Sequence, residues 1–384
     1  MGHRQAMGAL LGLIFAAGCT AILGIDEDYH QAGEGGGGGE GEAPLCTHTP
    51  KPVHPGDVAD SGDIDFVVAV RVIDMGEASD VGVGLDLDGM CTCLGEGPSC
   101  VSPSYATKEH CDRRGGVDNA ASSVFAAVVA SVGDSAFGSA YFSQMAEAGE
   151  WTLLVRVQGY NGQVNDPKVK VTFYETAGFG GLGGGAGGAG GAGGAGPTSQ
   201  PAWDGTDAWP ILTTSLLDQA SFDSPTYFDD KAYISQGKLV ASFPEVLLRM
   251  QGATSQVSVR LTASTLVGSI QNPASDNFGW RLVDSVIAGR WRTDDVFKSL
   301  GTYAFDGAAF CDDGSFTYST FKKAICGYVD IASTLGGVTA ECDSISFGMS
   351  VQTFPAKLGP LYSPDNTLSA CPPEQDPALD SCEM

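Results

Sequence analysis

Two acidic loops are the segments of this sequence best suited to bind a ligand. The first, GLDLDGMCTC at 84–93, sets Asp86 and Asp88 two residues apart and follows them with Gly89, which permits a tight turn. Carboxylate oxygens around a turn are the hard ligands that calcium prefers. We therefore predict a calcium site that is built from four carboxylates, Asp80, Asp86, Asp88 and Asp118.

The second acidic loop, CDRRGGVDNA at 111–120, supplies Asp118 and offers Asp112 and Asn119 as further oxygen ligands. The pattern departs from an EF-hand, because the first loop continues with Met-Cys after its glycine and has no closing glutamate. An alternative interpretation is structural, since aspartate and glycine favour turns and here lie beside cysteines. Both interpretations stay open, and calcium is the one cofactor that the sequence suggests.

The cysteines indicate an exported protein. Ten remain when Cys19 is set apart, and an even number is typical of a chain that is oxidised outside the cytoplasm. The four nearest the acidic loops have a spacing that could bind zinc in a reducing compartment, but export favours disulfides. The disulfide candidates are Cys46, Cys91, Cys93, Cys100, Cys111, Cys311, Cys326, Cys342, Cys371 and Cys382.

A glycine-rich tract at 178–196 divides these ten cysteines into five and five. Because both numbers are odd, full pairing within the chain requires at least one bridge between the two parts. The tract is then a disordered loop within one cross-linked body, and such long insertions cost little closure entropy. Since the ends of a domain commonly lie close together, we expect Cys46 to pair with Cys371 or Cys382.

Catalytic motifs do not stand out. The patterns GxSxG and HExxH do not occur, and no histidine follows the glycine tract, which excludes a histidine-based triad in that half. We name no catalytic residues and favour a non-enzymatic role, although 46 acidic residues leave a glycoside hydrolase open. Trp203 and Trp209 in PAWDGTDAWP are candidates for stacking on sugar rings, or else they anchor a strand.

Alternating hydrophobic residues predict that most of the body is β-structure. A period of two, with one buried face, appears in DFVVAVRVID at 65–74, QVSVRLTA at 256–263 and SISFGMSVQTF at 344–354. The segment 151–175 reads as two strands that are joined by a turn at Asn161-Gly162. Strands with one buried face are typical of packed antiparallel sheets, so we expect an antiparallel β-sandwich, with a jelly roll as one form of it.

Helical spacing of hydrophobic residues appears in three places. The segment DNAASSVFAAVVASV at 118–132 carries an apolar stripe, as do WRLVDSVIAGRW at 280–291 and TFKKAICGYVDI at 320–331. The last two lie close together in the sequence. We therefore expect a helical insertion near 279–331 in an otherwise mainly β protein.

The apolar segment LIFAAGCTAILG at 13–24 has the composition of an export signal, with Arg4 ahead of it and Ala16-Ala17-Gly18 directly before Cys19. AAGC resembles the lipobox of bacterial lipoproteins. The resemblance implies that Cys19 is the lipid attachment site, and that Thr20, where aspartate would signal inner-membrane retention, directs the chain to the outer membrane. A transmembrane anchor and a plain cleaved signal are the alternatives.

The composition narrows the partners. A net charge of −26 argues against nucleic acid, whose phosphates need clustered lysine and arginine. The layout as a whole resembles glycine-rich surface lipoproteins of Gram-negative bacteria, a resemblance that implies no particular activity. We expect a lipid-anchored, outer-membrane or cell-surface protein that acts as a non-catalytic binding or structural module for a polysaccharide or another envelope component; the alternative is a secreted, carboxylate-dependent glycoside hydrolase. The predicted organisation is a signal peptide at 1–18, a flexible acidic and glycine-rich tether at 19–45, and a single body at 46–384 that contains the loop at 178–200.

Overall fold

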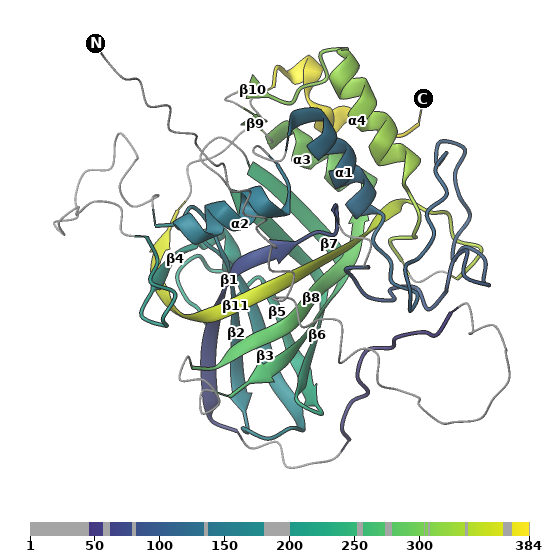
Figure 1. Ribbon diagram of the computed structural model, residues 1–384. Coiled ribbons are helices and arrows are strands. Elements are labelled where there is room, and N and C mark those ends of the chain that lie inside the picture. Colours follow the sequence, from purple (N-terminus) through teal and green to yellow (C-terminus); the bar gives the residue numbers. More distant parts are fainter. Residues whose placement is uncertain are drawn as a thin grey trace, which may run out of the picture. The chain divides into compact units, whose positions relative to one another are not determined.

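Eight strands, each antiparallel to its neighbours, form a closed barrel (Figure 1). In barrel order the strands are β1 (Ile64–Asp74), β2 (Leu153–Tyr160), β3 (Asp166–Glu175), β5 (Tyr227–Ser235), β6 (Lys238–Gln251), β7 (Gln256–Gln271), β8 (Arg281–Arg292) and β11 (Ser344–Tyr362). The pairing of β1 with β11, in which Val67 lies opposite Ala356, closes the ring.

The structure is a computed structural model. It describes residues 46–56, 62–78, 82–133, 137–179, 200–251, 256–272, 279–302, 304–305, 308–334, 337–363 and 371–383. Cys19, the tether, Asp80 and nearly all of the glycine-rich loop lie outside the described residues. The described residues all belong to one compact unit.

The expected β-sandwich is wrong, because the sheet closes on itself instead of packing against a second sheet. The predicted strands themselves are confirmed, and Asn161-Gly162 does form the turn between β2 and β3. Gly162 has a φ of +77°, which favours glycine, and the Gln163 N–H donates to Asn161 Oδ1 at 2.8 Å. Alternation within a strand indicates that one face of the strand is buried. A β-sandwich and a β-barrel both bury one face of each strand, so the alternation does not distinguish them.

Side chains fill the interior of the barrel. Val169, Val171 and Phe173, which the sequence places on one face of β3, are all buried. Phe173 packs against Phe243 of β6 with 4.6 Å between their ring centroids. The inward positions of the other barrel strands belong to the same core cluster, so this interior is a packed core.

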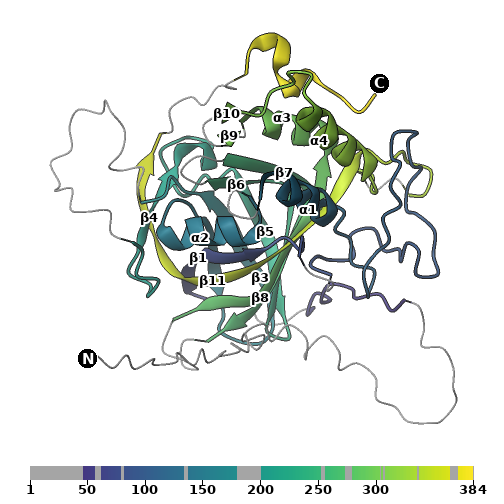
Figure 2. The same ribbon diagram turned by 45° about the horizontal axis from the view of Figure 1, so that its top comes forward.

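Four helices, α1 (Ala121–Val132), α2 (Ser139–Ala148), α3 (Thr293–Thr302) and α4 (Phe316–Gly327), gather toward one end of the barrel (Figures 1 and 2). Phe125 of α1 packs against Trp291 and Phe347 of the barrel, at centroid distances of 6.0 and 6.1 Å. The helix predicted at 118–132 is confirmed as α1. The helix predicted at 320–331 is confirmed in part, since α4 begins at Phe316 and ends at Gly327.

The helix predicted at 280–291 is wrong, because this segment is strand β8 and only α3 and α4 of the expected insertion are helical. Ile287 of β8 lies opposite Leu266 of β7 on one side and Met349 of β11 on the other. A short apolar run fits both periods, and here the two neighbouring strands decide between them.

A short strand, β4 (Ala208–Leu212), runs parallel to the end of β11 on the outside of the barrel, with Trp209 opposite Leu358. It is followed by the 3₁₀ turn η2 (Thr213–Ser215). Here a second hydrophobic cluster forms from Ala69, Leu154, Tyr174, Trp203, Trp209, Ile211 and Leu216. The remaining short elements are β9 (Ala304–Phe305), β10 (Ala308–Ala309), η4 (Pro373–Gln375) and η5 (Pro377–Leu379).

All ten cysteines from Cys46 onward form disulfides: Cys46–Cys91, Cys93–Cys111, Cys100–Cys342, Cys311–Cys371 and Cys326–Cys382. The predicted crossing bridge therefore exists. The expected partner of Cys46 is wrong, since Cys100–Cys342 makes the crossing and both tail cysteines bond within the second half. No helix in the described part of the chain is long and apolar enough to cross a membrane.

Candidate functional site

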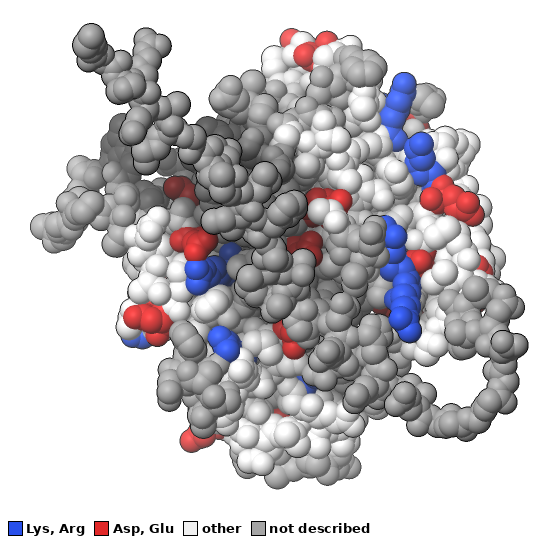
Figure 3. All heavy atoms as spheres, in the orientation of Figure 1, with Lys and Arg blue, Asp and Glu red and all other residues white. Residues whose placement is uncertain are grey.

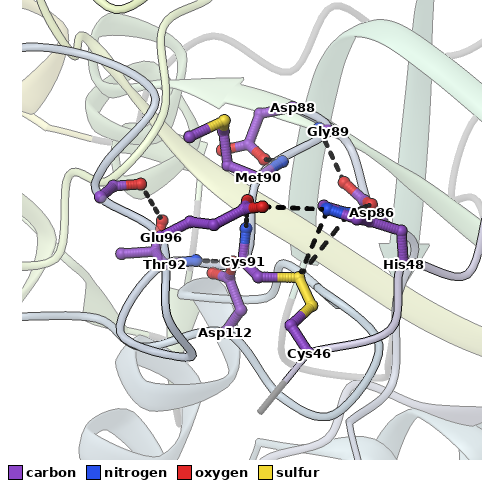
Figure 4. Close-up of a disulfide and its surroundings, with 11 residues drawn as sticks. Cys46, His48, Asp86, Asp88, Gly89, Met90, Cys91, Thr92, Glu96 and Asp112 are labelled. Atoms are coloured by element: carbon purple, nitrogen blue, oxygen red, sulfur yellow. Dashed lines mark hydrogen bonds and ion pairs between the residues drawn. A yellow bond between two sulfur atoms is a disulfide. The ribbon is translucent and has the colours of Figure 1, made fainter. Parts of the chain in front are cut away.

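The disulfides organise the long connection between β1 and α1, which carries the acidic loops. Cys46–Cys91 attaches the first described residues to this connection, and Cys93–Cys111 joins its two acidic loops. Figure 4 shows the first of these bridges with Asp86, Asp88 and His48 around it. An irregular segment of this kind is therefore held in place by covalent bonds and by its own turns.

Three carboxylates of the loops lie together. Asp86, Asp88 and Asp118 each offer an oxygen within 4.8 Å of the others. Asp118 reaches the first loop through an antiparallel bridge with Leu85, and its Oδ2 accepts a 2.6 Å hydrogen bond from the Leu87 N–H. Three of the four residues predicted for a calcium site are thus neighbours, and the fourth, Asp80, lies outside the described residues.

The turn in the first loop sets the directions of its carboxylates. Asp86 Oδ1 accepts from the Gly89 N–H at 2.7 Å, and Asp88 Oδ1 accepts from the Met90 N–H at 2.9 Å. Gly89 has a φ of +76°, so a glycine suits this position. Each aspartate keeps its second oxygen for other partners.

Two more carboxylates extend this group. Asp112 Oδ2 accepts from the Thr92 N–H at 2.6 Å. Asp330 accepts from both the N–H and the hydroxyl of Ser346, at 2.8 and 2.6 Å. We call Asp86, Asp88, Asp112, Asp118 and Asp330 the carboxylate cluster.

The cluster concentrates negative charge away from water. Burial raises the pKa of Asp118 well above its ordinary range, and repulsion from Asp88 and Asp112 raises it further. Burial also raises the pKa of Asp112 to about 6 and that of Asp330 to about 7. On the face of the molecule in Figure 3, acidic side chains are spread over the surface with basic side chains among them. Burial of several carboxyls together therefore distinguishes the cluster from the general acidity of the chain.

Two basic side chains face the cluster. Arg290 of β8 is only 4% exposed, donates from Nη2 to the Leu87 carbonyl at 2.6 Å, and interacts with the charges of Asp88, Asp118 and Asp330. Its Nε has no hydrogen-bond partner within the described residues. Within the described residues, Arg290 and His48 thus face five acidic groups.

His48 is the second basic group. Its Nδ1 lies 2.8 Å from Asp86 Oδ2 and its Nε2 lies 3.4 Å from Glu96 Oε1, beside the Cys46–Cys91 disulfide (Figure 4). The hydrogen bond with Asp86 raises the pKa of His48 above its ordinary value, and the bond with Glu96 acts in the same direction. A protonated His48 therefore competes with a metal ion for Asp86.

Sequence reasoning missed three members of this site. His48 and Asp330 lie far from the acidic loops in the sequence, and Arg290 sits on the segment that was expected to be helical. A lone histidine, aspartate or arginine carries no local signal of such a role. Only the folding of β8, β11 and the loops against one another brings these side chains together.

Asn119, the other ligand candidate, has a different role. Its Nδ2, with two N–H groups, lies within hydrogen-bond distance of the carbonyl oxygens of Met75, Val83 and Gly348, at 3.1, 2.7 and 3.1 Å, so that one N–H is shared. Its Oδ1 accepts from the N–H of Gly348 at 3.1 Å and from that of Ser122 at 3.2 Å. The side chain is therefore occupied with backbone groups.

The remaining site predictions have clear locations. Cys91, Cys93, Cys100 and Cys111, considered for zinc, all form disulfides and so offer no thiolate. Trp203 and Trp209 are 6% and 0% exposed, and their rings lie 5.3 Å apart in the second hydrophobic cluster. As the alternative interpretation expected, they anchor β4, and their burial leaves no ring face for a sugar.

Comparison with protein-family models, with curated proteins and with solved structures finds no match.

Proposed function

We propose that this chain is an exported, lipid-anchored module of the cell surface, non-catalytic, whose carboxylate cluster binds calcium and whose barrel serves a structural or polysaccharide-binding role. The observation that carries the calcium part is the approach of Asp86, Asp88 and Asp118 oxygens to within 4.8 Å of one another. Calcium favours such a set, since it takes about six to eight oxygen ligands and tolerates irregular geometry.

Charge balance supports a divalent ion in particular. Five acidic groups face one buried arginine and one histidine. Burial is the main cause of the raised pKa values of Asp112, Asp118 and Asp330, and repulsion from neighbouring aspartates adds to it. A bound cation would offset this repulsion. The loops carry few apolar residues of their own, so the ion would act with the disulfides in holding them.

The surroundings of the carboxyl groups support a non-catalytic role. A glycoside hydrolase needs two carboxyl groups about 5 to 9.5 Å apart in an open cleft. The carboxyls of Asp112 and Asp118 belong to buried residues. A hollow on the barrel surface contains Asp65, but both of its oxygens are bound by Arg156. Neither place offers the acid and base of a hydrolase, and the enzyme is therefore the less favoured alternative.

Export is supported by the cysteines, because five disulfides suit an oxidising compartment. The lipid anchor rests on the lipobox-like residues before Cys19, which lie outside the described residues. Two independent signals or several acyl chains are needed for stable anchoring, since each buried CH₂ contributes about 0.8 kcal/mol.

Calcium titration tests the proposal. We expect calcium at millimolar concentration to raise the melting temperature of the purified protein, because a ligand at ten times its Kd stabilises a fold by about 1.4 kcal/mol. Asp118→Asn removes one ligand charge and should abolish this response. Asp230→Asn, on an exposed position of β5, is the matched control and should respond like the wild type.

The same titration distinguishes a lost site from a lost fold. In EDTA, Asp118→Asn should be at least as stable as the wild type. Burial raises the pKa of the Asp118 carboxyl and so lowers the free energy of unfolding at neutral pH, and a neutral amide does not carry this cost. Two results would overturn the calcium proposal. One is an equal rise in melting temperature for Asp118→Asn and the wild type, and the other is no rise for the wild type at about 10 mM calcium.

A further inference from the structure

A hollow of about 370 Å³ opens on the barrel surface, away from the carboxylate cluster. It lies where β1, β2 and β11 meet the residue that precedes β8. Its polar lining comes from Asp65, Arg156 and Lys357, and its largest ring is Trp280. The rest of the lining is Phe66, Val67, Pro355, Ala356 and Leu358.

Trp280 is held as a platform at the edge of this hollow. Its ring stacks on Phe66 with 5.9 Å between the centroids and an interplanar angle of 23°. Tyr160 meets it nearly at right angles, at 5.4 Å. The indole is thus fixed by two aromatic neighbours while it remains half-buried and in contact with the hollow. A ligand would lose little entropy in ordering it.

Asp65 and Arg156 form a planar polar pair beside the platform. Arg156 donates from Nε to Asp65 Oδ1 at 3.1 Å and from Nη2 to Oδ2 at 2.6 Å. Their side chains remain 40% and 18% exposed, so the pair has acceptor and donor capacity left for a ligand. Its position is set by cross-strand pairing, since Arg156 lies opposite Val67 and Val67 opposite Ala356.

One ion pair of the hollow is closed within the chain. Asp65 neutralises Arg156, whereas Lys357 is exposed to solvent and interacts only weakly with Asp204. A charged ligand would have to compete with the Asp65–Arg156 pair. An uncharged ligand with one apolar face and several hydroxyl groups fits beside this pair without competing for its charges, and concave sites commonly combine an aromatic wall with a few placed polar groups.

We infer that this hollow binds a neutral pyranose ring of a polysaccharide, with one face of the sugar on Trp280 and its hydroxyls on the Asp65–Arg156 pair. The inference rests on the proposed non-catalytic binding role and does not depend on calcium. It places sugar recognition at Trp280, whereas the sequence had suggested the buried Trp203 and Trp209.

Binding of the purified full-length protein to neutral glucan, mannan and galactan oligosaccharides, and to a second set of charged uronic-acid oligosaccharides, tests the inference when it is measured by isothermal titration calorimetry. We expect Trp280→Ala to weaken binding about tenfold or more, as truncation of an aromatic anchor does. Phe228→Ala is the matched control, since Phe228 is an aromatic residue that is 40% exposed and lies outside the hollow. The affinity should change less than about twofold between low and high salt, because a neutral ligand forms no ion pair with the protein that salt could screen.

A second variant covers the case in which Trp280→Ala fails to fold. Asp65→Ala lies at the exposed rim and should also weaken binding, without loss of the near-ultraviolet circular dichroism of the folded protein. Oligosaccharide binding that Trp280→Ala and Asp65→Ala retain at wild-type strength overturns this site and leaves the proposed binding role standing. Binding only of charged glycans, lost in salt, overturns the assignment to neutral sugars. Absence of binding to any glycan overturns both the site and the polysaccharide part of the proposed function.

Discussion

The side-chain amide of Asn119 forms two hydrogen bonds with the backbone of Gly348, one in each direction and both of 3.1 Å. The amide thereby takes the place of a neighbouring strand beside β11. A side chain at 348 would collide with the Val83 carbonyl, so glycine allows this close approach. This contact joins the loop region to the barrel and places Asp118, the adjacent residue, within the carboxylate cluster.

Replacing Asn119 with alanine should destabilise the protein by about 3 kcal/mol or more, because several buried backbone groups would lose their partner together. Urea unfolding, followed by circular dichroism, measures this change. Lys323→Ala, on the exposed side of α4, is the control and should change stability by less than about 0.5 kcal/mol. Equal stability of the two variants would show that Asn119 does not hold the loops.

Cutting the chain within the glycine-rich tract should leave its two halves joined through Cys100–Cys342. A protease site inserted near residue 188 and a non-reducing denaturing gel provide the measurement. The double variant Cys100→Ser/Cys342→Ser should release two fragments, whereas Cys46→Ser/Cys91→Ser should not. The crossing bridge closes 242 residues, for which chain entropy gives a stabilisation of up to about 5 kcal/mol. Separation of the wild-type fragments would contradict this connectivity.

Stability in EDTA should fall as the pH rises from about 4 to 7. Burial raises the folded-state pKa of Asp330 from 3.8 to about 7, so the folded protein holds a proton that the unfolded chain has already lost in this range. One such group lowers the free energy of unfolding by about 1.4 kcal/mol per pH unit, until it ionises in the folded state as well. Asp330→Asn should flatten the dependence, which urea unfolding at several pH values measures. A wild-type stability that increases between pH 5 and 7 would refute the expected sign.

Trp209→Ala should cost about 3 to 5 kcal/mol, because the side chain is fully buried between Phe179 and Trp203. Leu217→Ala serves as the control, since Leu217 is 70% exposed. Thermal unfolding of the two variants gives the comparison. A folded Trp209→Ala protein of wild-type stability would be incompatible with an anchoring role for this residue.

Labelling of growing cells with a palmitate analogue should mark the wild-type protein and not Cys19→Ala. The expectation follows from the small residues that precede Cys19 and from their resemblance to a lipobox. Fractionation should find the labelled protein with the outer membrane. Label that persists on Cys19→Ala would remove the basis for this anchor.

The sequence alone determined the features that depend on neighbours along the chain. Period-two alternation identified β1, β2, β3, β7 and β11, helical spacing identified α1 and α4, and Asn161-Gly162 identified a hairpin. Odd numbers of cysteines on each side of the glycine tract required a crossing bridge. The sequence also placed Asp86, Asp88 and Asp118 in one candidate site, and their oxygens do lie together. Each of these follows from local geometry or from arithmetic.

Only the tertiary structure decided what depends on partners far apart in the chain. The pairing of Val67 with Ala356 closes a barrel where alternation allowed a sandwich, and two neighbouring strands make 281–292 a strand where spacing suggested a helix. Cys342 became the partner of Cys100 because β11 and the acidic loops lie side by side. Asp330 entered the carboxylate cluster, and Arg290 of β8 came to face it, through long-range packing of the same kind. The period of hydrophobic residues along a strand indicates which side chains are buried. Long-range packing decides which residues those side chains contact.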